Sequence, residues 1–116
     1  MTAANEMFDS AFRSASDKAG VFEHDGETGY FYLCETKRGK YRKIVAHIWV
    51  LNGTSDFTVK DISIRWDSTE SQVGLFIHGQ LWAAFDTSTG EKYGGDYHVG
   101  DQPKIPPEIT RTFETM

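Results

Sequence analysis

Apolar and polar residues alternate along much of the chain, which is the pattern of β-strands with one buried face. The alternation is cleanest in the segment Val59–Asp67, which predicts a strand. The residues predicted to face inward there are Ile62, Ile64 and Trp66, and those predicted to face outward are Ser63, Arg65 and Asp67. Two further apolar runs, Val73–Ile77 and Leu81–Phe85, flank a Gly79 turn and predict a β-hairpin.

An acidic turn organises the first half of the chain. Asp25-Gly26 suits a tight reversal, because glycine accepts a positive φ and aspartate bonds its own backbone. Aromatic residues, which favour strands, lie on both sides of it, at Phe22 and at Tyr30–Tyr32. We therefore expect two β segments joined by a short acidic loop.

In the segment Tyr41–Leu51 both faces of the expected strand are largely apolar. Ile44, Ala46, Ile48 and Val50 lie on one face, and Val45, His47, Trp49 and Leu51 lie on the other. A strand with two apolar faces is typical of the centre of a sheet that is covered on both sides. The pattern therefore predicts a central strand with a half-buried His47, followed by a turn at Asn52-Gly53.

The two ends of the chain have other patterns. In residues 1–19, Met7, Phe8, Ala11, Phe12 and Ala15 recur at helical spacing, which predicts one short helix; a flexible leader is the alternative. All three prolines lie between Gly100 and Pro107, so residues 101–116 are expected to leave the sheet and run extended. Residues 20–100 form the predicted β domain.

These elements predict one mainly β domain, at the margin of the α+β class. We expect a twisted antiparallel meander of about six strands with one N-terminal helix, because short strands joined by tight turns pair sequentially. The pattern leaves two architectures open, a half-barrel and a small sandwich.

Charge and composition narrow the function classes. The 116 residues carry a net charge of −5, which disfavours nucleic acid as the main partner. Five of the twelve basic residues lie in Lys37–Lys43, interpreted as a charged hairpin loop, which leaves seven elsewhere against seventeen acidic residues. No apolar run is long enough for a membrane span, and no signal peptide is recognised. With a single cysteine, Cys34, a reducing cytoplasm is the expected location.

Motifs for catalysis or cofactor binding are not found in the sequence. It contains no phosphate-binding loop, dinucleotide fingerprint, nucleophile elbow or zinc-protease motif. The histidines, His24, His47, His78 and His98, lack the close spacing of metal ligands. Cys34 lies among aromatic residues and is interpreted as an inert buried thiol. We therefore expect no catalytic residues, no cofactor and no structural metal.

Two functions remain open. The first is a non-enzymatic protein-binding module, for example of the immunity or antitoxin type, in which Glu23, Asp25, Glu27 and Tyr30 contact a basic protein partner. The second is a small-ligand or enzymatic domain with a pocket in the curled sheet, lined by Trp49, Trp82, Tyr97 and His98. The acidic residues could equally serve only to keep the domain soluble.

Three segments carry a family resemblance: Phe22-Glu23-x-Asp25-Gly26-x-Thr28-Gly29-Tyr30-Phe31-Tyr32, Ile62-x-Ile64-x-Trp66, and the hairpin from Leu75-Phe76-Ile77-x-Gly79 to Ala84-Phe85-Asp86. Together they resemble DUF2251, a bacterial family of unknown function. The resemblance is expected to cover roughly residues 20–100, as one domain. It implies no activity.

Overall fold

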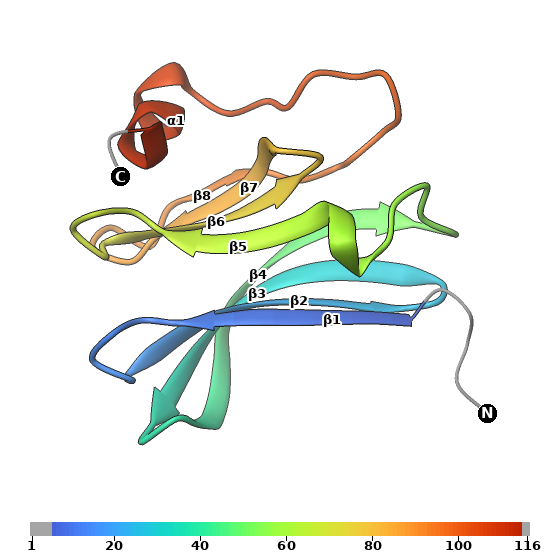
Figure 1. Cartoon of the computed structure of the whole chain (residues 1–116). Helices are drawn as coiled ribbons and strands as arrows, with labels where there is room; N and C mark the ends of the chain where they lie inside the picture. Colours follow the sequence, from blue (N-terminus) through green and yellow to red (C-terminus); the bar gives the residue numbers. More distant parts are fainter. Residues whose placement is uncertain (1–5, 115–116) are drawn as a thin grey trace.

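The computed structural model describes residues 6–114 of the chain. Within that range, eight strands, one 3₁₀ turn and one α-helix follow one another (Figure 1). The strands are β1 (Glu6–Phe12), β2 (Lys18–Asp25), β3 (Thr28–Lys37), β4 (Lys40–Asn52), β5 (Ile62–Trp66), β6 (Gln72–Ile77), β7 (Gln80–Asp86) and β8 (Lys92–Gly94). The helical elements are η1 (Val59–Asp61) and α1 (Pro107–Glu114).

The strands form two four-stranded antiparallel sheets, in the orders β1-β2-β3-β4 and β5-β6-β7-β8. Within each sheet every strand pairs antiparallel with the next one in sequence, which confirms the predicted sequential antiparallel pairing. The predicted number of about six strands in one meander is wrong, because the link between β4 and β5 starts a second sheet. The two sheets stack face to face, so the fold is a sandwich (Figure 1).

The main core fills the space between the two sheets. Phe31 of β3 and Phe85 of β7 meet across it with ring centroids 5.1 Å apart. The predicted inward residues Ile62, Ile64 and Trp66 are all buried, as expected from their alternation. A Cβ atom at Gly20 would lie only 2.7 Å from Val73 Cγ2, so glycine there allows β2 to approach β6 closely.

The outer face of the second sheet is covered by α1 (Figure 1). Ile109 and Phe113, one turn apart on the helix, are buried against this sheet, and Phe113 meets Phe76 edge-on at 5.5 Å. The predicted extended tail, residues 101–116, is therefore wrong over Pro107–Glu114; residues 115–116 lie outside the described range. Proline suits the first helical position, where its missing N–H is not needed. Among residues 6–114 no helix has the length and apolar content to cross a membrane.

The predicted N-terminal helix is also wrong where the structure describes it. Glu6–Phe12 form β1, paired antiparallel with β2, and residues 1–5 of the predicted helix lie outside the described residues. Met7 faces the core, whereas Phe8 and Phe12 face outward. Pairing satisfies backbone groups along β2, and this tertiary gain outweighs the weak helical spacing. The β domain consequently begins at Glu6 rather than at residue 20.

β4 covers the predicted strand Tyr41–Leu51 but is an edge strand rather than a central one. Ile44 and Val45 are 56% and 42% exposed, and His47 is exposed rather than half-buried. Part of the edge is covered, because the N–H groups of Asp96 and Tyr97 donate to carbonyl oxygens of β4 at 3.1 and 2.6 Å. Ile48, Val50 and Leu51 are buried in the core, whereas the exposed large apolar residues of β4 are Tyr41, Ile44, Val45 and Trp49.

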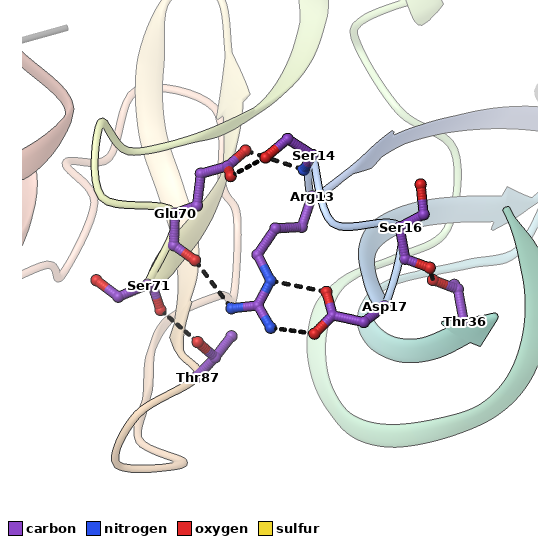
Figure 2. A network of polar contacts seen from close by, with 8 residues as sticks. All are labelled: Arg13, Ser14, Ser16, Asp17, Thr36, Glu70, Ser71 and Thr87. Atoms are coloured by element: carbon purple, nitrogen blue, oxygen red, sulfur yellow. Dashed lines mark hydrogen bonds and ion pairs between the residues drawn. The ribbon is translucent and has the colours of Figure 1, made fainter. Parts of the chain in front are cut away.

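A polar network joins the β1–β2 turn to the β5–β6 turn at one end of the sandwich (Figure 2). Arg13 binds Asp17 through two parallel hydrogen bonds of 2.9 and 2.5 Å, and its Nη1 donates to the carbonyl oxygen of Glu70 at 3.1 Å. The Glu70 carboxylate accepts from the hydroxyl and the N–H of Ser14, and these bonds lower its pKa. The network ties the two sheets together at this end.

Asp67, predicted to face outward, is buried instead. Its Oδ1 accepts the N–H groups of Ser71 and Gln72 at 3.0 and 3.1 Å. The carboxylate thus closes the loop between β5 and β6, which explains why a polar residue at an alternating position turns inward.

Candidate docking face

The acidic turn between β2 and β3 is held by one of its own carboxylates. Asp25 Oδ1 accepts the N–H groups of Thr28 and Glu27 at 2.8 and 2.9 Å, and these bonds lower the pKa of Asp25. Both Asp25 and Glu27 are exposed on the turn, but the Asp25 carboxylate is used to hold the turn backbone. The predicted contact residue Asp25 acts first as a turn former.

His24, at the base of the turn, is buried and bonded within the fold. Its Nδ1 accepts from the N–H of Gly26 at 3.2 Å, and its Nε2 lies 2.9 Å from the carbonyl oxygen of Gly53. The Nε2–H tautomer satisfies both bonds, so His24 ties the β2–β3 turn to the end of β4.

Two of the predicted contact residues, Glu23 and Tyr30, lie on the outer face of the first sheet, the face turned away from the second sheet. Cross-strand partners share a face, so the pairing register assigns this outer face as three rows. The rows are Phe8–Glu23–Tyr30–Trp49, Ser10–Val21–Tyr32–His47 and Phe12–Ala19–Cys34–Ile44. Glu23 and Tyr30 are therefore neighbours across the strands, as a shared contact surface requires.

Large apolar side chains on this outer face are exposed. Phe8 is 54% exposed, and Phe12 packs its ring 5.4 Å from the ring of Tyr41 at the hairpin. Tyr30 stacks on Tyr32 with centroids 5.8 Å apart. Isolated exposed apolar residues need no explanation, but a contiguous set on one sheet face is a feature of interaction sites.

A depression of about 250 Å³ lies in the outer face. It is lined by Phe8, Val21, Glu23, Tyr32, Cys34, Tyr41, Arg42, Lys43 and Ile44. Burial raises the pKa of the Cys34 thiol, and burial together with the nearby charge of Glu23 raises the pKa of Tyr32. Cys34 is buried, as predicted, and its raised pKa keeps it in the unreactive thiol form.

The sequence interpretation missed Phe8, Phe12, Tyr41 and Ile44. Phe8 and Phe12 were assigned to a helix, and Ile44 to a covered strand face. A usable signal was present, because Phe8, Ser10 and Phe12 also follow the two-residue period of a strand.

Charge divides the outer face into two ends. The acidic end consists of exposed carboxylates at and beside the β2–β3 turn, Glu6, Glu23, Asp25 and Glu27. The basic end consists of exposed residues at the β3–β4 hairpin, Lys37, Arg38, Lys40, Arg42 and Lys43. The two turns lie at opposite ends of β3, about 30 Å apart for a strand of that length. The hairpin of the basic end bends away from the second sheet (Figure 1).

The predicted pocket is formed only in part. Trp49, Tyr97 and His98 line a second depression of about 220 Å³, whereas Trp82 is buried behind Tyr97, with ring centroids 4.7 Å apart. Trp82 is therefore a core residue and not a lining residue. The sequence interpretation missed Asp56, which also lines this depression.

Two polar groups of this second depression, those of Tyr97 and Asp56, are bonded to each other. The Tyr97 hydroxyl donates to Asp56 Oδ1 at 2.8 Å, and burial together with this bond raises the pKa of Tyr97 to about 12. His98 Nε2 lies 3.2 Å from the Asp96 carboxylate at the exposed rim. Among residues 6–114, no group of three His, Cys, Asp or Glu side chains is placed to hold a metal ion.

Comparison with known proteins shows which family this chain belongs to. The family model described as "Uncharacterized protein conserved in bacteria (DUF2251)" matches residues 1–98. The chain belongs to the DUF2251 family. The match includes the first nineteen residues, so the expected start of the family segment at residue 20 is wrong. It ends before α1, in agreement with the prediction that the C-terminal segment lies outside.

This DUF2251 protein is also similar to an uncharacterized protein of Haemophilus influenzae. The two are 28% identical over 95 residues, which covers 74% of this chain and 59% of the relative. The matched region thus spans less than two thirds of the relative's length. No solved structure matches the chain significantly.

Proposed function

We propose that this DUF2251 protein is a non-enzymatic protein-binding module that docks a basic protein segment on the outer face of its first sheet. The observation that carries the proposal is the difference between the two sheets. The outer face of the second sheet is covered by α1, whereas on the first sheet Phe8, Tyr41 and Ile44 stay about half exposed. Apolar side chains of this size are costly to leave in water and suit a partner.

The acidic end favours a basic partner. Glu6, Glu23 and Asp25 border one shallow hollow together with Phe8, so negative charge lies next to an exposed aromatic ring. A partner segment with lysine or arginine beside apolar residues would gain both burial and charge complementarity. A toxin neutralised by an immunity-type or antitoxin protein would be one concrete partner of this kind. The single buried cysteine suits a cytoplasmic location for such a module.

The Trp49 depression supports the alternative, a small-ligand or enzymatic domain, less well. Its Tyr97 hydroxyl is already bonded to Asp56, and Trp82 is not accessible from it. A ligand there would find the Tyr97–Asp56 pair already bonded, and the other polar side chains of the lining, those of Asn52, Thr54 and His98, are exposed at the surface.

Site-specific photo-crosslinking in native cells tests the proposal. A photoreactive phenylalanine analogue at Phe8 should crosslink a protein, and the same analogue at Val99, which is 70% exposed and lines neither of the two hollows beside Phe8, should not. The double variant Glu23→Lys with Glu27→Lys should weaken the crosslink at Phe8, because it reverses charge at the acidic end. Asp25 is kept, because its loss would disturb the turn.

Crosslinks of equal strength at Phe8 and Val99 would contradict the proposal. The same holds if no crosslink forms at Phe8, or if charge reversal leaves the crosslink unchanged.

A further inference from the structure

We propose that the basic segment docked on the outer face belongs to a second copy of this chain, packed face to face around a two-fold axis. In this dimer the acidic end of each copy meets the basic end of the other. The inference rests on the proposed function, because it names the partner of the same face.

The charges of the outer face are complementary to themselves. Glu23 and the pair Arg42–Lys43 line the same depression, on opposite sides of its apolar centre. Glu23 lies opposite Tyr30 on the outer face, and Lys43 lies opposite Glu35, about 17 Å farther along β3. Glu35 alternates with the outer-face Cys34, so this register assigns Lys43 to the other face. Arg42, which the register leaves unpaired between Tyr41 and Lys43, supplies the positive charge at the basic side of the depression. A second copy that is turned end for end brings carboxylates onto basic side chains at both ends.

The direction of the two-fold axis follows from this arrangement. A closed two-fold interface uses the same patch on both subunits. An axis perpendicular to the strands places the acidic end on the basic end twice, whereas an axis parallel to the strands places like charges together. Opposed like charges cost free energy, so the perpendicular axis is preferred.

The apolar centre supplies the attraction that charge alone does not. Exposed Phe12 and Ile44 lie in one row between the charged ends, Phe8 lies beside Glu23 at the acidic end, and Tyr41 lies within the basic hairpin next to Phe12. Four strands spaced at about 4.8 Å, with lengths of roughly 23 to 43 Å, give a flat area of roughly 600 Å². Protruding side chains raise the accessible area above that figure, toward the roughly 800 Å² per partner of a standard interface.

The rest of the charge distribution also fits a self-complementary face. Five of the twelve basic residues gather at the basic end, and the seventeen acidic residues lie outside that segment of the sequence, with Glu35 beside it as the cross-strand partner of Lys43. In a dimer, the basic end of each copy meets acidic residues of the other copy. A hydrophobic centre with a charged rim is the usual arrangement of a specific interface.

Sedimentation equilibrium of the full chain, with a pair of charge-reversed variants, tests the dimer. The wild type should have twice the chain mass of 13.1 kDa and dissociate as ionic strength rises. The acid-reversed variant (Glu23→Lys, Glu27→Lys) and the base-reversed variant (Arg42→Glu, Lys43→Glu) should each be monomeric. An equimolar mixture of the two should restore a dimer, because the reversed ends are complementary again.

Two further variants serve as controls. Glu108→Lys with Glu114→Lys changes the same number of charges on α1, away from the outer face, and should leave the dimer intact. Ile44→Lys should abolish the dimer without unfolding the chain, since Ile44 is 56% exposed. A circular dichroism spectrum identical to that of the wild type verifies that each variant is folded.

Three results would overturn the dimer. A monomeric wild type at high concentration would exclude it, and a crosslink from Phe8 to a different protein would then leave the proposed function standing alone. A dimer that persists in both reversed variants would use another surface. Monomeric variants that fail to associate when mixed would exclude the antiparallel arrangement. A missing or charge-insensitive crosslink at Phe8 would instead contradict the proposed function itself.

Discussion

The indole N–H of Trp66 donates to the carbonyl oxygen of Ala11 at 3.0 Å and thereby links β5, the first strand of one sheet, to β1, the first strand of the other. The Arg13 guanidinium lies 5.6 Å from the centre of the same Trp66 ring. The Trp66 ring thus packs in the core between the sheets, and its N–H satisfies a carbonyl oxygen of the edge strand β1. The same ring also contacts Arg13 of the polar network between the turns. Trp66 is an anchor between the sheets.

Replacement of this anchor should be strongly destabilising. Trp66→Ala is expected to lower the free energy of unfolding by about 3–5 kcal/mol, because it removes a large buried side chain and leaves a cavity. Trp66→Phe keeps part of the packing but leaves the Ala11 carbonyl without its donor, at a smaller cost of about 1–3 kcal/mol. Urea denaturation measures both values. Val99→Ala, at an exposed site, is the control, and a wild-type midpoint for Trp66→Ala would contradict the anchor role.

Asp17 should make stability depend on acid. Its hydrogen bonds with Arg13 lower the pKa of Asp17. A carboxyl group with a lowered folded pKa stabilises the fold above its unfolded pKa, and this stability is lost as pH falls through the folded value. Asp17→Asn should therefore cost stability at neutral pH, by less than about 1 kcal/mol for an exposed pair. The difference from wild type should shrink below about pH 4.

Urea titrations between neutral and acid pH measure this difference. Arg13→Gln removes the same pair from the other side together with the bond to the Glu70 carbonyl oxygen, so it should cost more stability than Asp17→Asn but share its pH dependence. A difference between wild type and Asp17→Asn that stays constant with pH would rule out the pair as its source.

Tyr97 should make stability depend on base. Burial and the bond to Asp56 raise the pKa of Tyr97 to about 12, so the fold favours the neutral phenol. That stability is fully present below the unfolded pKa of about 10 and is lost as pH rises through the folded value. Tyr97→Phe should be less sensitive to pH between about 10 and 12 than the wild type. Thermal midpoints over this range test it, and parallel curves for the two proteins would be the contrary result.

Phe113 should hold α1 on the second sheet. Phe113→Ala removes the ring that meets Phe76 at 5.5 Å, and a helix of eight residues is marginal without packing. We expect α1 to detach while the two sheets stay folded. Trypsin cleavage after Arg111 should accelerate, with Glu114→Ala as the control at an exposed position of the same helix. Cleavage at the wild-type rate would mean that other contacts secure α1.

The sequence alone was sufficient for the local features of the fold. The Asp25-Gly26 turn, the alternating strand and the hairpin around Gly79 were predicted, because each depends on near neighbours: a turn residue, an alternation of apolar and polar residues, an apolar run. The strand predicted over Val59–Asp67 is shorter than expected, since Val59–Asp61 form the 3₁₀ turn η1 and β5 ends at Trp66. The burial of Trp66 and Cys34 followed from the same patterns. The acidic residues of the candidate site were also visible, since charge is read directly from residue type.

Tertiary structure decided which strands pair with one another and which faces of the sheets are covered. Glu6–Phe12 fits a helix or a strand equally well by spacing, and only the open edge of β2 selected the strand. β4 was apolar at both parities, yet it became an edge strand, because the chain started a second sheet after Asn52 instead of adding a neighbour. Burial is a property of the partner surface as much as of the residue. The apolar outer face of the first sheet, and the separation of its acidic and basic ends, therefore emerged only when distant strands were aligned in register.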